Sequence, residues 1–149
     1  MIYIEFESKV KAVSVQVIER AAKRALEHKS ASGDISIVLT NNARLHQLNH
    51  DYLGVDAPTD VLSFPASETD PETGARYLGD ILISIARAEE QAKSASHPLE
   101  AEVQLLVVHG VLHLLGHDHA NAKEKAMMWK VQAEILESIG LSGIEIQES

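Results

Sequence analysis

The stretch VQLLVVHGVLHLLGHDH, residues 103–119, decides how the rest of this chain must fold. Its first part is apolar on nearly every side of a helix, so that helix must be buried. Pro98 suits the first helical position and Glu100 suits the first turn, which predicts a helix over about 98–115. A buried helix needs other elements packed around it, and the flanking sequence has to supply them.

The flanking sequence predicts strands and helices along the whole chain. Strands are expected where β-branched and apolar residues gather, at 2–6, 34–40, 61–64 and 78–84. Apolar residues at helical spacing and capping residues predict helices at about 13–28, 42–53, 84–94 and 121–139. Pro65 is expected to close its strand, and the polar segment 67–76 to form a mobile loop. We therefore predict an α+β fold, with residues 1–149 forming one compact domain in which helices pack on a small mixed sheet.

Length and composition are those of an ordinary globular protein. The 149 residues are 45% hydrophobic and 23% charged, and the absence of cysteine excludes disulfides and thiolate metal sites. The N-terminal MIYIEFESKV has no basic region followed by an apolar stretch, and no apolar run approaches the roughly 20 residues that span a bilayer. We therefore expect a cytoplasmic protein with no membrane partner. The net charge of −9 argues against a sequence-blind nucleic-acid binder, although a bound cation would concentrate positive charge locally.

Four histidines lie within residues 109–119, and three of them have the spacing of metal ligands. His109 and His113 are four residues apart, so on a helix they lie on one face. His119 would lie about 9 Å beyond His113 if the helix continued at 1.5 Å per residue. Gly116 resolves this, because glycine readily takes the left-handed conformation that ends a helix and folds the chain back. We predict one metal ion held by the three histidines at the C-terminal end of the buried helix.

Zinc is the ion that we expect at this site. Three neutral imidazoles usually leave one position for water, which is the arrangement of a catalytic zinc site. Availability favours zinc, since affinity alone would favour copper. Asp118 is a candidate helper beside a ligand, with a solvated loop aspartate as the alternative. His117 is expected to point away from the ion, and the remaining histidines are interpreted as packed or solvated: His28, His46, His50 and His97.

The three histidines also have the spacing of the long zinc-protease motif, with one difference. That motif places a catalytic glutamate directly after its first histidine, and this chain has Gly110 there. Peptide hydrolysis depends on that base, so a protease is not expected. The glycine is also expected to open space beside the metal, which could admit a bulky substrate or let another backbone segment approach closely. A phosphodiester is the better substrate, because a metal can polarise a phosphoryl oxygen while the base, or a 2′-hydroxyl nucleophile, comes from elsewhere.

These motifs together resemble the YbeY family of zinc-dependent endoribonucleases. The family pattern H-G-x-L-H-L-x-G-[YH]-D-H matches residues 109–119, P-T-D-V-L-S-F-P matches 58–65, and L-G-D-I matches 78–81. The resemblance covers essentially the whole chain. It implies a single-strand-specific endoribonuclease that acts in 16S ribosomal RNA 3′-end maturation and ribosome quality control, with His109, His113 and His119 as zinc ligands. It also implies ribosomes or ribosome-associated proteins as partners.

One departure from the family pattern concerns substrate binding. Family members commonly carry an arginine after the tyrosine that precedes PTDVLSFP, whereas here Tyr52 is followed by Leu53. An arginine there would hold a phosphate. Arg76 and Arg87 are candidate substitutes, the alternative being that each is an ordinary surface arginine. Asp80 is a candidate catalytic helper, with a structural hydrogen-bonding role as its alternative.

Two other functions stay open. The first is another zinc hydrolase, such as a peptidase, against which Gly110 counts. The second is a zinc-stabilised domain that docks on ribosomes without catalysis, a hypothesis that the acidic charge and Leu53 favour. In that second case, metal removal would lower the melting temperature while the purified protein cleaved nothing.

Overall fold

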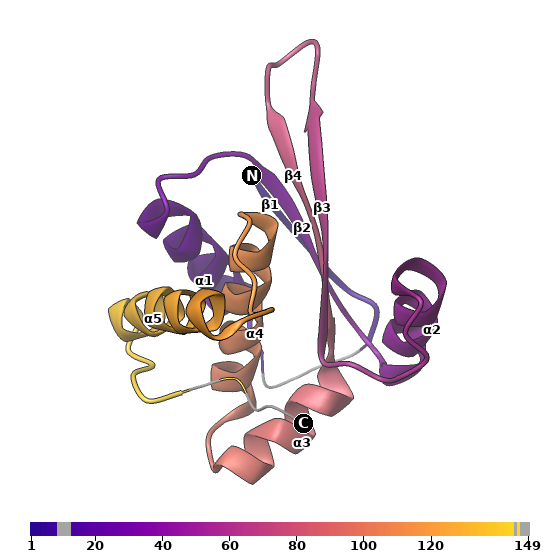
Figure 1. The fold of residues 1–149 in the computed structure, drawn as a ribbon, viewed down its shortest axis with the longest axis vertical. Helices are drawn as coiled ribbons and strands as arrows, with labels where there is room; N and C mark the ends of the chain where they lie inside the picture. Colours follow the sequence, from indigo (N-terminus) through magenta and orange to yellow (C-terminus); the bar gives the residue numbers. More distant parts are fainter. Residues whose placement is uncertain (9–12, 145, 147–149) are drawn as a thin grey trace.

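The computed structural model describes residues 1–8, 13–144 and 146, and its elements follow the predicted order (Figure 1). The strands are β1 (Ile2–Phe6), β2 (Asp34–Thr40), β3 (Val61–Thr69) and β4 (Arg76–Ser84). The helices are α1 (Val15–His28), α2 (Asn42–Leu53), α3 (Ile85–Ala95), α4 (Leu99–Leu114) and α5 (Ala122–Ser138). The predicted α+β fold is therefore confirmed.

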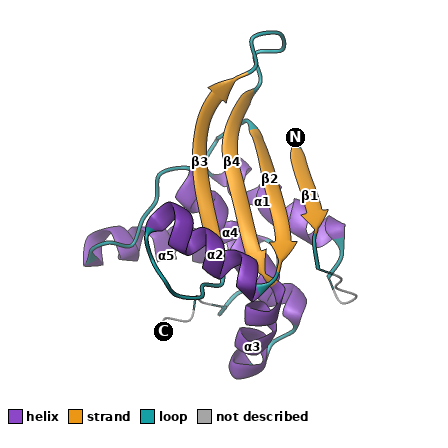
Figure 2. Cartoon of the chain, turned by 90° about the vertical axis from the view of Figure 1, so that its right-hand side faces the viewer, coloured by secondary structure: helices purple, strands orange, loops and turns teal. Residues whose placement is uncertain are grey.

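The four strands form one mixed sheet in the order β1-β2-β4-β3. Strand β2 pairs in parallel with both β1 and β4, whereas β3 pairs antiparallel with β4. Helix α2 lies on one face of this sheet, and α1, α4 and α5 lie on the other (Figures 1 and 2). Helix α4 contacts both β3 and β4, so the predicted buried helix lies against the sheet and beneath other helices.

The segment 67–76, which we expected to be a loop, contains the turn of a hairpin at residues 70–75, whereas residues 67–69 and 76 belong to its two strands. Strand β3 continues through Pro65 to Thr69, so the prediction that this proline closes the strand was wrong. The proline is tolerated because β3 is an edge strand and because its register with β4 shifts just after Pro65. The hairpin extends beyond the other two strands (Figure 2), and the part of β3 nearer the core contacts α4.

The side chains of β4 alternate between the two faces of the sheet and join both sides of the core. Ile81 is fully buried in the cluster that includes α4, whereas Leu82 packs with Leu45 of α2. Helix α4 is buried at every residue from Ala101 to Leu112, as its apolar composition predicts. Among the helices of the described residues, none is long and apolar enough to cross a membrane.

Candidate metal centre

The end of α4 turns back through the motif glycine as predicted. Gly116 has φ +97°, and its N–H donates to the carbonyl of His113 at 3.1 Å. The N–H of His117 donates to the carbonyl of Leu112 at 2.9 Å. These two bonds satisfy carbonyls that the helix end would otherwise leave without partners. The turn returns His119 to the end of the helix, where the ring centroids of His113 and His119 lie 5.2 Å apart.

His109, His113 and His119 form a group that could hold one metal ion. Each offers one ligand nitrogen, and these atoms all lie within 4.8 Å of one another. The Nε2 atoms of His109 and His113 are 3.1 Å apart. Zinc bonded tetrahedrally at about 2.0–2.1 Å holds its ligand nitrogens roughly 3.4 Å apart, so modest side-chain rotations are enough. The structure thus brings together the three residues that the spacing predicts.

Burial keeps two of these imidazoles neutral. Desolvation lowers the pKa of His109 to about 4; Gln132 opposes this shift, and the neighbouring His113 and His119 reinforce it. Desolvation also lowers the pKa of His113, again reinforced by His119. Both side chains therefore carry a lone pair at pH 7 and can bind a metal without first losing a proton.

Gln132 of α5 orients His109, and it was not among the predicted site residues. Its Oε1 atom lies 2.9 Å from Nδ1 of His109 and can only accept, so Nδ1 carries the proton. The unprotonated Nε2 atom is then directed at His113, as metal binding requires. The side chain is 1% exposed. The sequence does contain one indication of this role. Gln132 is a polar residue among the buried apolar residues of α5, which are Met128, Val131, Ile135 and Leu136.

The histidines border a cleft of about 730 Å³. Residues 59–63 and Pro65 of the PTDVLSFP segment form one wall. Ser63 ties this wall to α4, because its hydroxyl donates to the carbonyl of Gly110 at 3.1 Å. The other lining residues are Leu53, His117, Asp118, Gly116, Trp129 and Ile146. Among the described residues that line it, none is a lysine or an arginine.

Asp118 and Leu53 both border this cleft. The carboxylate of Asp118 accepts from the N–H of His119 at 2.7 Å and acts electrostatically to raise the pKa of His113. The side chain of Leu53 is 54% exposed at the position where the family pattern has arginine. The cleft therefore holds one predicted helper carboxylate, and it presents an apolar side chain where the family pattern has a cation.

The other predicted helpers lie elsewhere. Asp80 has the same strand parity as Leu82, so it faces the α2 side of the sheet, and its carboxylate accepts from the hydroxyl of Tyr77. Arg87 lies on α3, 3.9 Å from a carboxylate oxygen of Glu90. Arg76 lines a separate cavity. The structure does not bring Asp80, Arg76 or Arg87 to the cleft that the histidines border.

The remaining histidines lie outside the metal group, as expected. Within the described residues, that group contains only the three predicted ligands, and His117 borders the cleft without joining it. Four others each lie within 4 Å of a carboxylate: His28 near Glu134, His46 near Asp56, His50 near Asp51, and His97 near Glu102.

Gly110 is needed for packing and does not open the metal site. A Cβ atom at this position would lie only 2.8 Å from Cγ2 of Ile81, so the glycine lets α4 lie close to β4. The prediction that Gly110 opens space for a substrate or another backbone was wrong, because the side chain of Ile81 fills the space beside it. The side chain of a glutamate at this position would start towards Ile81 of the sheet and would need Ile81 to move.

Comparison with known proteins identifies close relatives. A family model described as "Endoribonuclease YbeY" matches residues 3–140. The endoribonuclease YbeY of Brevibacillus brevis is 42% identical over 140 residues, covering 86% of each chain. That of Geobacillus kaustophilus is 41% identical over 149 residues, covering 94% of this chain and 96% of the relative. The fold is similar to the solution structure of TM1509 from Thermotoga maritima, with TM-score 0.59, 26% identity, and coverage of 94% and 92%.

Proposed function

Because the chain belongs to the YbeY endoribonuclease family, we propose that it is a zinc-dependent endoribonuclease that cleaves single-stranded ribosomal RNA. The observation that carries the proposal is the three-histidine group at the edge of the cleft. Within the described residues, no fourth histidine, aspartate or glutamate joins this group, which suits an ion that must also bind water or substrate. One zinc ion per chain fits this donor set.

The residues of the cleft suit a single-stranded phosphodiester. A zinc ion bound by three histidines supplies Lewis acidity and lowers the pKa of its water. Gln132 holds His109 in the tautomer that such binding needs. Asp118 is the predicted carboxylate that lines the cleft, so it is the candidate to accept a proton. Trp129 and Leu53 give the cleft aromatic and apolar surface, which favours unstacked bases over a duplex.

The biological setting follows from the family resemblance. We propose that residues 1–149 act as one domain in the maturation of the 16S ribosomal RNA 3′ end and in ribosome quality control. This role places the protein in the cytoplasm with ribosomes or ribosome-associated proteins as partners.

The proposal is tested by cleavage of an end-labelled single-stranded RNA with protein of measured zinc content. Wild type should cut, whereas His113→Ala and chelator-treated protein should lose at least about 100-fold in rate, because the metal site has lost a ligand or its ion. His46→Ala is the matched control, since His46 is an exposed histidine bound to Asp56 at 2.7 Å and lies outside the metal group.

Two outcomes would contradict the proposal. If zinc is bound at one per chain and no RNA is cut, the non-catalytic ribosome-docking alternative takes its place. The absence of lysine and arginine among the described cleft-lining residues is the observation in favour of that alternative. If His113→Ala cuts as fast as wild type, the activity does not belong to this metal site.

A further inference from the structure

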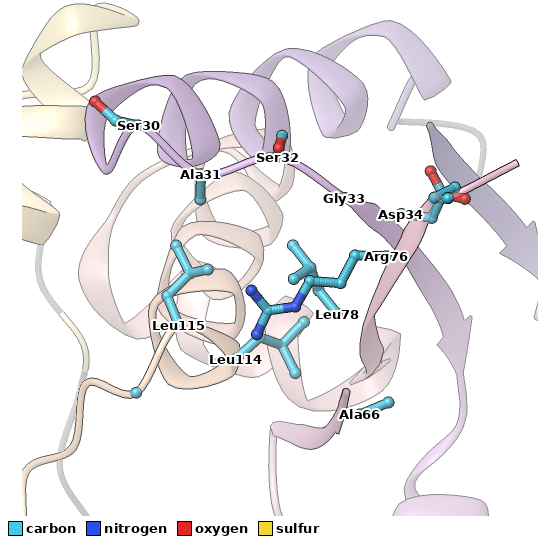
Figure 3. Close-up of a pocket in the computed structure, with 13 residues that line it drawn as sticks. Ser30, Ala31, Ser32, Gly33, Asp34, Ala66, Arg76, Leu78, Leu114 and Leu115 are labelled. Carbon is cyan, nitrogen blue, oxygen red and sulfur yellow. The ribbon is translucent and has the colours of Figure 1, made fainter. Parts of the chain in front are cut away.

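A second cavity, of about 870 Å³, adjoins the metal cleft, and the guanidinium of Arg76 points into it (Figure 3). We propose that this cavity, the Arg76 cavity, binds a backbone phosphate of the RNA strand beside the nucleotide that is cleaved. This proposal rests on the proposed ribonuclease function. Residues 30–34, the hairpin and the end of α4 form its walls. Arg76 lies outside the three segments that match the family patterns, residues 58–65, 78–81 and 109–119.

The two cavities meet at the turn after α4. Gly116 lines both of them, and the neighbouring residues Pro65 and Ala66 of β3 line one each. A Cβ atom built at Gly116 would meet no other side chain or backbone atom within 4 Å. The space beside Gly116 is therefore open among the described residues, so an RNA strand held in the metal cleft would reach the Arg76 cavity by crossing this glycine.

The chemistry of the Arg76 cavity suits a nucleotide. Figure 3 shows the guanidinium beside Leu114 and Leu115, whose side chains offer an apolar surface for a base. Among the described residues, the side chain of Arg76 takes part in no hydrogen bond or ion pair, so its five donors can meet a phosphate. The acidic member of the lining, Asp34, is already bound at 2.7 Å to the terminal ammonium of Met1.

The metal cleft itself needs such a contact. Binding of single-stranded nucleic acid draws much of its free energy from cationic groups on phosphates, and no described residue lining the cleft is a lysine or arginine. The position that carries arginine in the family is Leu53. Lys123 lies beyond the other side of Gly116, but it shares its small cavity with Asp118 and Glu124. Among the described residues that line the Arg76 cavity, the acidic residue is Asp34, which is paired with Met1.

Binding of two oligonucleotides to the zinc-loaded protein tests this proposal. The probes are fluorescent 2′-O-methyl phosphorothioate strands of three and nine nucleotides, and anisotropy gives Kd as a function of salt. Arg76→Ala should weaken binding of the longer strand about 10-fold and leave the shorter one unchanged. The slope of log Kd against log salt should fall by about 0.7, the value for one phosphate contact on a single strand. Arg76→Lys keeps the charge, so its slope should match wild type.

Arg87→Ala is the matched control, because Arg87 is a half-exposed arginine near Glu90 and lines neither cavity. An unchanged melting temperature shows that Arg76→Ala is folded. If Arg76→Ala binds the longer strand with the Kd and salt slope of wild type, the phosphate site is overturned while the ribonuclease proposal stands. If wild type neither binds these strands nor cleaves RNA, both proposals fall together.

Discussion

His109 illustrates how a single position prepares a metal site. The residue is 5% exposed, and burial is the largest of the causes that lower its pKa and hold its imidazole neutral. Gln132 then decides which nitrogen carries the proton, through one hydrogen bond of 2.9 Å. A neutral ring in the wrong tautomer would direct an N–H at the ion, so burial and the amide acceptor are both needed.

Replacing Gln132 with leucine should therefore weaken zinc binding, while the size of the side chain changes little. We expect a loss of about 10- to 100-fold in affinity, the range seen when a ligand's hydrogen-bond partner is removed. Gln132→Glu keeps an acceptor at the same place and should retain most of the affinity. Competition with a coloured zinc chelator measures both variants, and equal affinity of Gln132→Leu and wild type would show that Gln132 does not position the ligand.

Helix α4 can lie against β4 only because one of its residues lacks a side chain. Gly110 faces Ile81, and on the next strand Ser63 bonds to the carbonyl of the same glycine. The helix is thus fixed against two strands at the turn that carries His109 and His113. The position that supplies the base in a zinc protease supplies close packing here, and the metal ligands owe their placement to it.

Completing the protease motif with Gly110→Glu should therefore destabilise the fold without creating a peptidase. The carboxylate would be forced into an apolar interface without a partner, and an uncompensated buried charge costs several kcal/mol. Gly110→Ala is the milder comparison, with a cost of about 1–3 kcal/mol from overpacking against Ile81. Urea denaturation measures both, and a stable Gly110→Glu protein with chelator-sensitive peptidase activity would contradict the packing argument.

The whole molecule assembles one centre from segments far apart in the sequence. Helix α4 and its turn bring the ligands, α5 brings Gln132, and β3 closes the cleft.

The buried side chain of His109 makes the stability of the folded protein depend on pH. Between pH 6.5 and about 4, His109 binds a proton in the unfolded chain but not in the folded one. Stability therefore falls as pH drops through this window and is fully present above it.

Metal-free protein should accordingly lose about 2 kcal/mol of unfolding free energy through His109 between pH 7 and pH 5. Urea denaturation of chelator-treated wild type and His109→Gln at both pH values isolates this contribution, because glutamine does not titrate. Zinc should stabilise wild type at pH 7 and less so at pH 5, where protons compete for the ligands. An equal loss in both metal-free proteins would show that His109 is not the group responsible.

The sequence alone determined the parts of this protein that depend on local geometry. The helical period puts His109 and His113 on one face, and Gly116 supplies the left-handed residue that returns His119, as the structure confirms. The apolar composition of residues 103–115 likewise requires a buried helix. These features could be predicted because each rests on the conformations available to a few consecutive residues.

Only the tertiary structure decided which distant segments meet. The sequence suggested Asp80 as a helper, but strand alternation places it on the far face of the sheet, and Gln132 enters the site from a helix that starts after the ligands. Pro65 continues an edge strand because of where that strand lies in the sheet. Whether a strand is at an edge, and which face meets which helix, depends on packing across the whole core, and no local pattern of residues encodes it.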